Sequence, residues 1–116
     1  MWLAAFVKRC APGPETVTRN IETACRFLVD WPGVRKVWLF GSIAKGRTPD
    51  WRSDIDFAVE GILPVDIFAL WSELDARLTM PVDVVRLEDA PALLRSEILK
   101  GRLLWEAGQP KPAAIA

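Results

Sequence analysis

Two aspartates are spaced so that they could hold a metal ion. They lie in the alternating segment Asp54-Ile55-Asp56-Phe57-Ala58-Val59, which predicts a β-strand. Residues two apart on a strand project from the same face, with backbones roughly 6–7 Å apart. Two neighbouring carboxylates repel each other, and a cation relieves that repulsion. Mg²⁺ suits carboxylates combined with phosphate oxygens and water. The pair therefore indicates a magnesium site, although any strand with one solvated face shows the same alternation.

A glycine-serine turn lies ahead of the aspartates. Gly41 and Ser42 follow the apolar segment 34–40 and begin a polar loop that runs to residue 53. Glycine lets the backbone approach a phosphate closely, and the serine hydroxyl and neighbouring N–H groups can bond phosphate oxygens. Gly-Ser after a strand often makes only a turn, so the signal depends on the aspartates that follow. Further candidates for nucleotide contacts in this loop are Lys45, Arg47 and Ser53.

A third carboxylate, Asp83, lies among valines in the segment 82–87. Val82, Val84 and Val85 are expected in the core, and an isolated aspartate among them needs a polar partner. A bound cation is one partner that would satisfy it. An aspartate at a sheet edge or a strand end would look the same in the sequence.

The elements that position these residues follow from hydrophobic periodicity and from the glycines and prolines that interrupt it. The pattern predicts helices with apolar positions from Val17 to Val29, from Pro64 to Leu78, and from a cap at Asp89, with Pro91 in the first turn, to Gly101. It predicts strands at 34–40, 54–59, 82–87 and 102–106. This order indicates an α/β fold, a small mixed sheet flanked by helices.

Composition narrows the functional classes. The 116 residues suit one domain, which we expect at 1–108 with a flexible tail at 109–116. Fifteen basic and fifteen acidic residues balance, which argues against general nucleic-acid binding. There is no histidine, so neither a Ser-His-Asp triad nor an imidazole metal site is possible. The apolar start at 2–7, a core or interface candidate, is too short for a signal peptide, and no run reaches membrane-spanning length.

Cysteine usage fits the same picture. Cys10 and Cys25 form no metal-binding spacing and are expected as free thiols in a reducing cytosol. The protein is therefore expected in the cytoplasm.

The motif as a whole is more specific than its parts. The segments Gly41-Ser42-Ile43-Ala44-Lys45-Gly46 and Ser53-Asp54-Ile55-Asp56-Phe57-Ala58-Val59 resemble the signature of the polymerase-β nucleotidyltransferase superfamily. The resemblance is closest to the minimal nucleotidyltransferases (MNT) that pair with HEPN proteins. It implies a polymerase-β-like fold in which Gly41 and Ser42 hold the triphosphate. It also implies that Asp54, Asp56 and Asp83 bind Mg²⁺ and carry catalysis.

The resemblance also suggests a reaction and a partner. The expected activity is Mg²⁺-dependent transfer of AMP from ATP to a hydroxyl of a HEPN toxin, which would make the chain an antitoxin that acts by AMPylation. One alternative is a small-molecule nucleotidyltransferase with the same site. Another is a non-catalytic antitoxin that neutralises its partner by binding.

Overall fold

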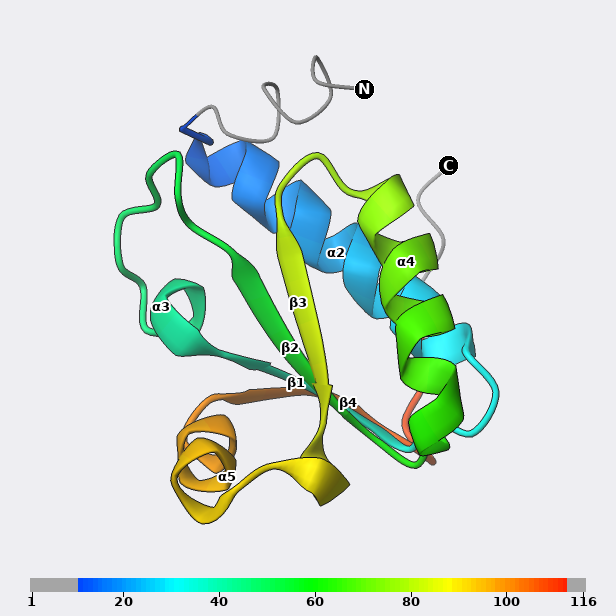
Figure 1. Ribbon diagram of the computed structural model, residues 1–116. Helices are drawn as coiled ribbons and strands as arrows, with labels where there is room; N and C mark the ends of the chain where they lie inside the picture. Colours follow the sequence, from blue (N-terminus) through cyan, green and yellow to red (C-terminus); the bar gives the residue numbers. More distant parts are fainter. Residues whose placement is uncertain (1–10, 113–116) are drawn as a thin grey trace.

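A mixed four-stranded sheet forms the centre of the computed structural model, which describes residues 11–112 (Figure 1). The strands are β1 (Lys36–Phe40), β2 (Ile55–Glu60), β3 (Val82–Arg86) and β4 (Arg102–Glu106), in the order β3-β2-β1-β4. The central strand β1 is antiparallel to β2 and β4, whereas β2 and β3 are parallel. The predicted mixed sheet is confirmed. The expectations for Trp2–Val7 and Cys10 lie outside the described residues.

Helices cover both faces of this sheet. They are α2 (Pro14–Asp30), α3 (Gly41–Ala44), α4 (Ile67–Arg77) and α5 (Ala92–Leu99), with 3-10 turns at Pro64–Asp66 and Leu87–Asp89. Helices α2 and α4 lie on one face, and α5 lies on the other (Figure 1). The α4 segment is the crossover that the parallel pair β2–β3 requires.

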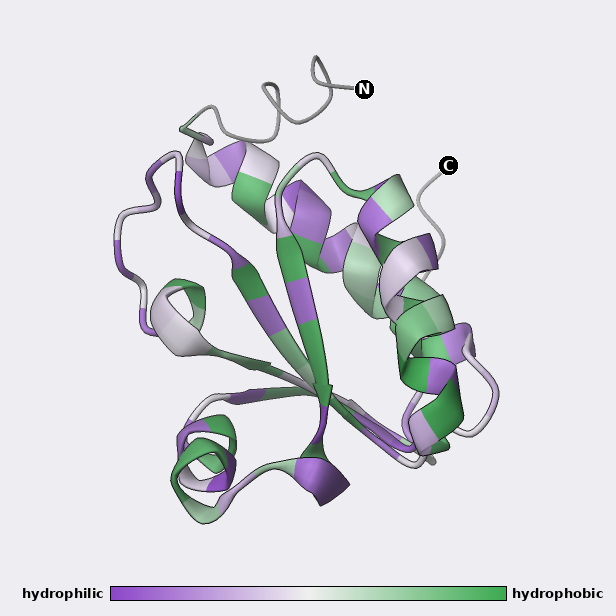
Figure 2. Ribbon diagram, viewed as in Figure 1, coloured by the Kyte–Doolittle hydropathy of each residue, from purple (hydrophilic) through white to green (hydrophobic). Residues whose placement is uncertain are grey.

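The alternating pattern of β2 divides its side chains between two cores. Ile55, Phe57 and Val59 are fully buried in the larger core beneath α2 and α4. Ala58 belongs to a smaller core with Ile98 beneath α5. Figure 2 shows the hydrophobic colour along the strands and a hydrophilic α3–β2 loop. One short helix covers the second face, so residues at its margin can remain accessible.

Three details differ from the sequence-based expectation. Asp89 lies in a 3-10 turn and does not cap α5, whose N-cap is Pro91 with no side-chain cap hydrogen bond. Asp89 instead pairs with Arg86, an interaction between side chains that local propensity does not encode. The apolar spacing of this helix also predicts that Leu99 faces inward, but Leu99 is 51% exposed, because the short helix buries only one narrow stripe. Trp71 is also partly exposed and lies against the edge of β3, where its indole N–H donates to the Val82 carbonyl.

The C-terminal residues after β4 keep contact with the domain. The Gln109 carbonyl accepts from the Trp105 indole at 3.3 Å, and Lys111 Nζ lies 3.0 Å from Asp30. The boundary between domain and tail near residue 108 stays a prediction. No helix among residues 11–112 has both the length and the apolar character needed to cross a membrane.

Candidate active site

The two strands that carry acidic residues bring Asp56 and Asp83 side by side. In the parallel pair β2–β3, Asp56 is the register partner of Asp83. Asp54 immediately precedes β2, two residues before Asp56. Because register partners project from the same face, both strand carboxylates lie on the α5 side of the sheet. Across the other neighbour, Asp56 pairs with Phe40, the last residue of β1.

Asp56 has the most perturbed environment of the three carboxylates. Burial, together with the negative charges of Asp83 and Asp54, raises the pKa of Asp56 from 3.8 to about 6. The side chain is only half-buried, whereas Asp54 and Asp83 are exposed. A half-buried carboxylate beside two others is a group that a cation would stabilise. The chemistry of these donors therefore fits Mg²⁺.

Gly41 packs its backbone directly against Asp56. It has φ +79°, a left-handed conformation that favours glycine. A Cβ on Gly41 would collide with the Asp56 carboxylate oxygen Oδ2. The missing side chain thus leaves the space in which the carboxylate of one strand meets the turn that follows another. Any ligand held at this turn lies next to Asp56.

The turn continues into the four-residue helix α3. Lys45 N–H donates to the Gly41 carbonyl and Arg47 N–H donates to the Ser42 carbonyl. Ser42 lies in the first turn of α3, in the place predicted for a phosphate contact. Arg47 is exposed. The structure thus keeps Gly41, Ser42 and Lys45 together at the end of β1.

Ser53 has a structural task in the same loop. Its Oγ accepts a hydrogen bond from the Asp50 N–H at 2.8 Å, and its own N–H donates to the Asp50 carbonyl at 3.1 Å. These bonds close a turn just before Asp54. They give the serine a local role, and a contact from its hydroxyl to a nucleotide stays a prediction.

The three carboxylates are neighbours but do not form a ready-made cage. Within residues 11–112, no group of three or more His, Cys, Asp or Glu side chains is placed so that it could hold a metal ion as it stands. Mutual repulsion keeps like charges apart when no cation neutralises them. The register of the strands places the backbones of Asp56 and Asp83 side by side. Their side chains would have to rotate before the carboxylates could share a cation.

Two basic residues on the other side of Gly41, Lys100 and Arg102, were not identified from the sequence. A cavity of about 50 Å³ lies beside Gly41 and is lined by Lys45, Lys100 and Arg102 together with Glu97. Lys45 Nζ forms an ion pair with Glu97 at 3.1 Å, and this lysine lowers the pKa of Glu97. The α5–β4 turn brings these cations to the end of β1. The sequence signal was only two basic residues flanking Gly101, which commonly indicates a helix end.

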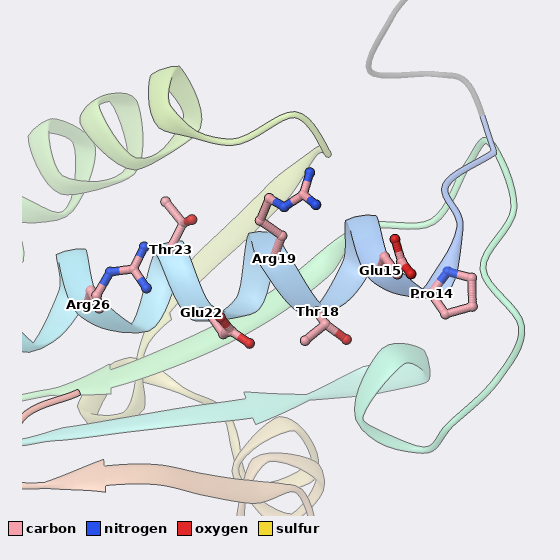
Figure 3. Close-up of a pocket in the computed structure, with 7 residues that line it drawn as sticks. All are labelled: Pro14, Glu15, Thr18, Arg19, Glu22, Thr23 and Arg26. Atoms are coloured by element: carbon pink, nitrogen blue, oxygen red, sulfur yellow. The ribbon is translucent and has the colours of Figure 1, made fainter. Parts of the chain in front are cut away.

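A larger hollow, about 560 Å³, lies on α2, the helix on the opposite face of the sheet from α5. Its described lining residues all come from α2, as Figure 3 shows, and are Pro14, Glu15, Thr18, Arg19, Glu22, Thr23 and Arg26. Acidic and basic side chains alternate along this face at helical spacing, the usual pattern of a solvated helix surface. The carboxylates of β2 and β3 therefore remain the candidate site.

Comparison with known proteins identifies the class. The family model "Polymerase beta, Nucleotidyltransferase" matches residues 22–109. The chain belongs to this nucleotidyltransferase family, and its mixed sheet with flanking helices is the polymerase-β-like fold. No curated protein matches it in sequence.

Solved structures indicate which branch of the family it resembles. A toxin–antitoxin structure with AMP-PNP is 26% identical with a TM-score of 0.63, covering 77% of this chain and 74% of the other. The MNT antitoxin in complex with a tri-AMPylated HEPN toxin from Shewanella oneidensis is 26% identical with a TM-score of 0.60, covering 78% and 72%. A protein described as a minimal nucleotidyltransferase is 26% identical with a TM-score of 0.59, covering 77% and 92%. The predicted resemblance to MNT antitoxins is confirmed.

Proposed function

We propose that this chain transfers AMP from ATP to a hydroxyl group of a HEPN-family partner protein and thereby acts as an antitoxin. The observation that carries the proposal is the placement of Asp56 opposite Asp83 and against Gly41. Support for the donor comes from a similar toxin–antitoxin structure with AMP-PNP. Support for the acceptor comes from a similar MNT antitoxin found with an AMPylated HEPN toxin.

The reaction is an in-line displacement at phosphorus. The hydroxyl oxygen of the acceptor forms a bond to the α-phosphorus of ATP, the bond from that phosphorus to the oxygen bridging to the β-phosphate breaks, and pyrophosphate leaves. The acceptor hydroxyl gives its proton to a base or to solvent. Bound Mg²⁺ supplies stabilisation of the charge that develops on the phosphate oxygens.

In this proposal the residues of the chain have separate roles. Asp54, Asp56 and Asp83 hold the metal. The Gly41-Ser42 turn holds the triphosphate. Lys45 neutralises phosphate charge after leaving Glu97, its partner in the structure. We also propose that this activity resides in a single domain, 1–108.

Intact mass spectrometry tests the proposal. The purified chain is incubated with ATP, Mg²⁺ and the protein encoded by the adjacent gene, which the proposal expects to belong to the HEPN family. That partner should gain the mass of one or more adenylyl groups. Asp54→Asn combined with Asp56→Asn should abolish the gain, while the exposed Glu22→Gln variant should retain it. An unmodified partner with the wild-type chain, at enzyme and nucleotide concentrations that saturate binding, would count against the proposal.

A non-catalytic antitoxin is the second candidate, and one observation favours it. The three carboxylates are not arranged as a metal-holding group. In this case the chain would neutralise its partner by binding alone. The double Asp54→Asn and Asp56→Asn variant would then protect cells as well as the wild type does, whereas the catalytic proposal requires that protection be lost. A small-molecule acceptor would appear instead as pyrophosphate release in a metabolite screen without a protein partner.

A further inference from the structure

The outer edge of β3 offers backbone groups that no other strand uses. The Ile55 N–H donates to the Pro81 carbonyl at 3.0 Å, and Ile55 is the register partner of Val82. In a parallel ladder, successive residues direct their N–H and C=O groups alternately to one neighbour and to the other side. Asp83 and Val85 therefore direct their backbone groups to β2. Val82, Val84 and Arg86 direct theirs outward.

Only part of this edge is capped. The Trp71 indole N–H donates to the Val82 carbonyl at 2.8 Å. Within residues 11–112, the outward backbone groups of Val84 have no hydrogen-bond partner. Proteins commonly protect a free edge with lysine, proline or a bulge, and β3 has none of these between Val82 and Arg86. Val84 thus presents one donor and one acceptor that an added chain could pair.

An apolar groove of about 270 Å³ runs along the same edge. Its lining residues are Ile67, Val84, Val85, Arg86, Asp89, Ala90, Pro91 and Leu94. One wall comes from Ile67 of α4, the helix that lies beside β3 in Figure 1. The other wall comes from Ala90, Pro91 and Leu94 at the start of α5. Next to Ile67 in the chain, Phe68 of α4 and Val65 of the preceding 3-10 turn are each 79% exposed. A segment lying in the groove would therefore contact apolar surface on both sides.

Asp83 directly precedes Val84, Val85 and Arg86, the β3 residues that line the groove. We propose that an extended segment of the acceptor protein pairs with the outer edge of β3 and places its hydroxyl-bearing side chain opposite Asp83. Residues directly opposite on neighbouring strands share a face, with Cβ atoms roughly 4.5–5.5 Å apart. A residue paired with Asp83 points to the α5 side of the sheet, where Asp56 lies. This inference rests on the proposed function and specifies how its acceptor docks.

The groups along the edge select an extended and non-acidic segment. Free N–H and C=O groups on one strand match the backbone of an extended chain, whereas a helix has no free backbone groups along its side. Arg86 pairs with Asp89 at 2.6 Å, so the uncompensated charge along the strand is that of Asp83. An acidic side chain opposite Asp83 would be repelled, and a neutral hydroxyl would not.

Hydrogen–deuterium exchange tests the docking directly. The Val84 amide of the free protein should exchange faster than the amides of Asp83 and Val85, which bond to β2. Addition of the HEPN-family partner of the proposed function, without nucleotide, should slow exchange at Val84 by about tenfold or more. An unchanged Val84 amide in the formed complex would overturn the inference. Protection of the Val84 amide in the protein alone that becomes stronger at higher protein concentration would also overturn the inference. A second copy of the chain would then occupy the edge.

Two variants give an independent test through the rate of adenylylation. Val84→Pro removes the outward N–H but no hydrogen bond to β2, and proline is tolerated at such edge positions. Leu94→Asp places a charge in the groove, and its matched control is Leu93→Asp, since Leu93 is 85% exposed and does not line the groove. Val84→Pro and Leu94→Asp should lower kcat/KM for the partner about tenfold or more, equivalent to 1.4 kcal/mol, while Leu93→Asp changes it less than about twofold.

The outcomes separate this inference from the proposed function. Normal rates in folded Val84→Pro and Leu94→Asp would remove the docking model and leave the transferase proposal intact. Protection at Val84 without any adenylylation by the wild type would support edge docking and remove the transferase proposal. Thermal unfolding shows whether each variant is folded, and exchange in the wild type decides the question if either variant is not.

Discussion

Replacement of Asp56 by asparagine should stabilise the metal-free protein, although it removes a residue of the candidate active site. In the folded chain burial and the neighbouring carboxylates raise the pKa of Asp56 from 3.8 to about 6. A raised pKa means that the folded state binds the proton more tightly than the unfolded state, so ionisation of Asp56 costs folding free energy. That cost grows as the pH rises from about 4 to about 6 and is constant above. Asparagine carries no charge and avoids it.

The size of the effect follows from the two pKa values. Their difference corresponds to about 3 kcal/mol. The side chain is only half-buried, and solvent screening reduces this to about 1–2 kcal/mol. For a domain of this size, the Asp56→Asn variant should therefore unfold about 4–8 °C higher at pH 8 without metal. At pH 4 the difference in melting temperature between the variant and the wild type should nearly vanish. Asp56 of the folded wild type is then protonated and, like asparagine, carries no charge.

Thermal unfolding in EDTA at several pH values measures this difference. The exposed Glu22→Gln variant loses one negative charge on α2, far from the cluster, and serves as the control with little change. Addition of Mg²⁺ and ATP should reverse the order, since a ligand at one hundred times its Kd stabilises the wild type by about 2.7 kcal/mol. An Asp56→Asn variant that is less stable than the wild type at pH 8 in EDTA would refute the claim that ionised Asp56 destabilises the metal-free fold.

Three further predictions concern other parts of the structure. Gly41→Ala should lower the free energy of unfolding by about 1–3 kcal/mol, because alanine is strained in the left-handed backbone conformation. Its Cβ would also displace Asp56, so calorimetry should show weaker Mg²⁺-dependent ATP binding. Unchanged binding would contradict the close approach of Gly41 to Asp56. Glu97→Gln should leave the melting temperature unchanged and tighten ATP binding roughly threefold at low salt, since it frees Lys45; weaker binding would argue against a phosphate role for this lysine. Asn20→Ala should cost about 2–3 kcal/mol in urea unfolding, because Asn20 is buried and makes three hydrogen bonds; a change below the error of the fit would show that water replaces them.

The sequence predicts the strands better than the helix boundaries. The alternation of polar and apolar residues in β2 reflects the burial of every second side chain. Six residues contain this whole signal, and the structure has the strand at Ile55–Glu60. The predicted start of α5, with Asp89 as its cap, was wrong because Asp89 forms an ion pair with Arg86. That contact overrides the preference of aspartate for the N-cap position. Hydrophobic periodicity therefore fixes which face is buried, while the ends of elements depend on contacts made elsewhere.

The candidate site was predictable to the extent that it lies in one motif. Gly41, Ser42, Asp54 and Asp56 were found from local spacing. The proximity of Asp83 to Asp56 depends on the β2–β3 register, and only the family resemblance, not the residue pattern, suggested it. The cations at 100 and 102 were missed because their approach to Gly41 depends on how α5 and β4 pack.

The register between β2 and β3 makes the fold and the site dependent on the same alternation. A slip of β3 by one residue would turn Asp83 into the core beneath α2 and α4 and expose two valines that are now buried. In such a slipped sheet Asp83 would no longer lie beside Asp56, and its charge would be buried without a partner. The cost of that buried charge disfavours the slipped register. Changes in the length of the crossover between β2 and β3 should therefore be tolerated only where they leave this alignment unchanged.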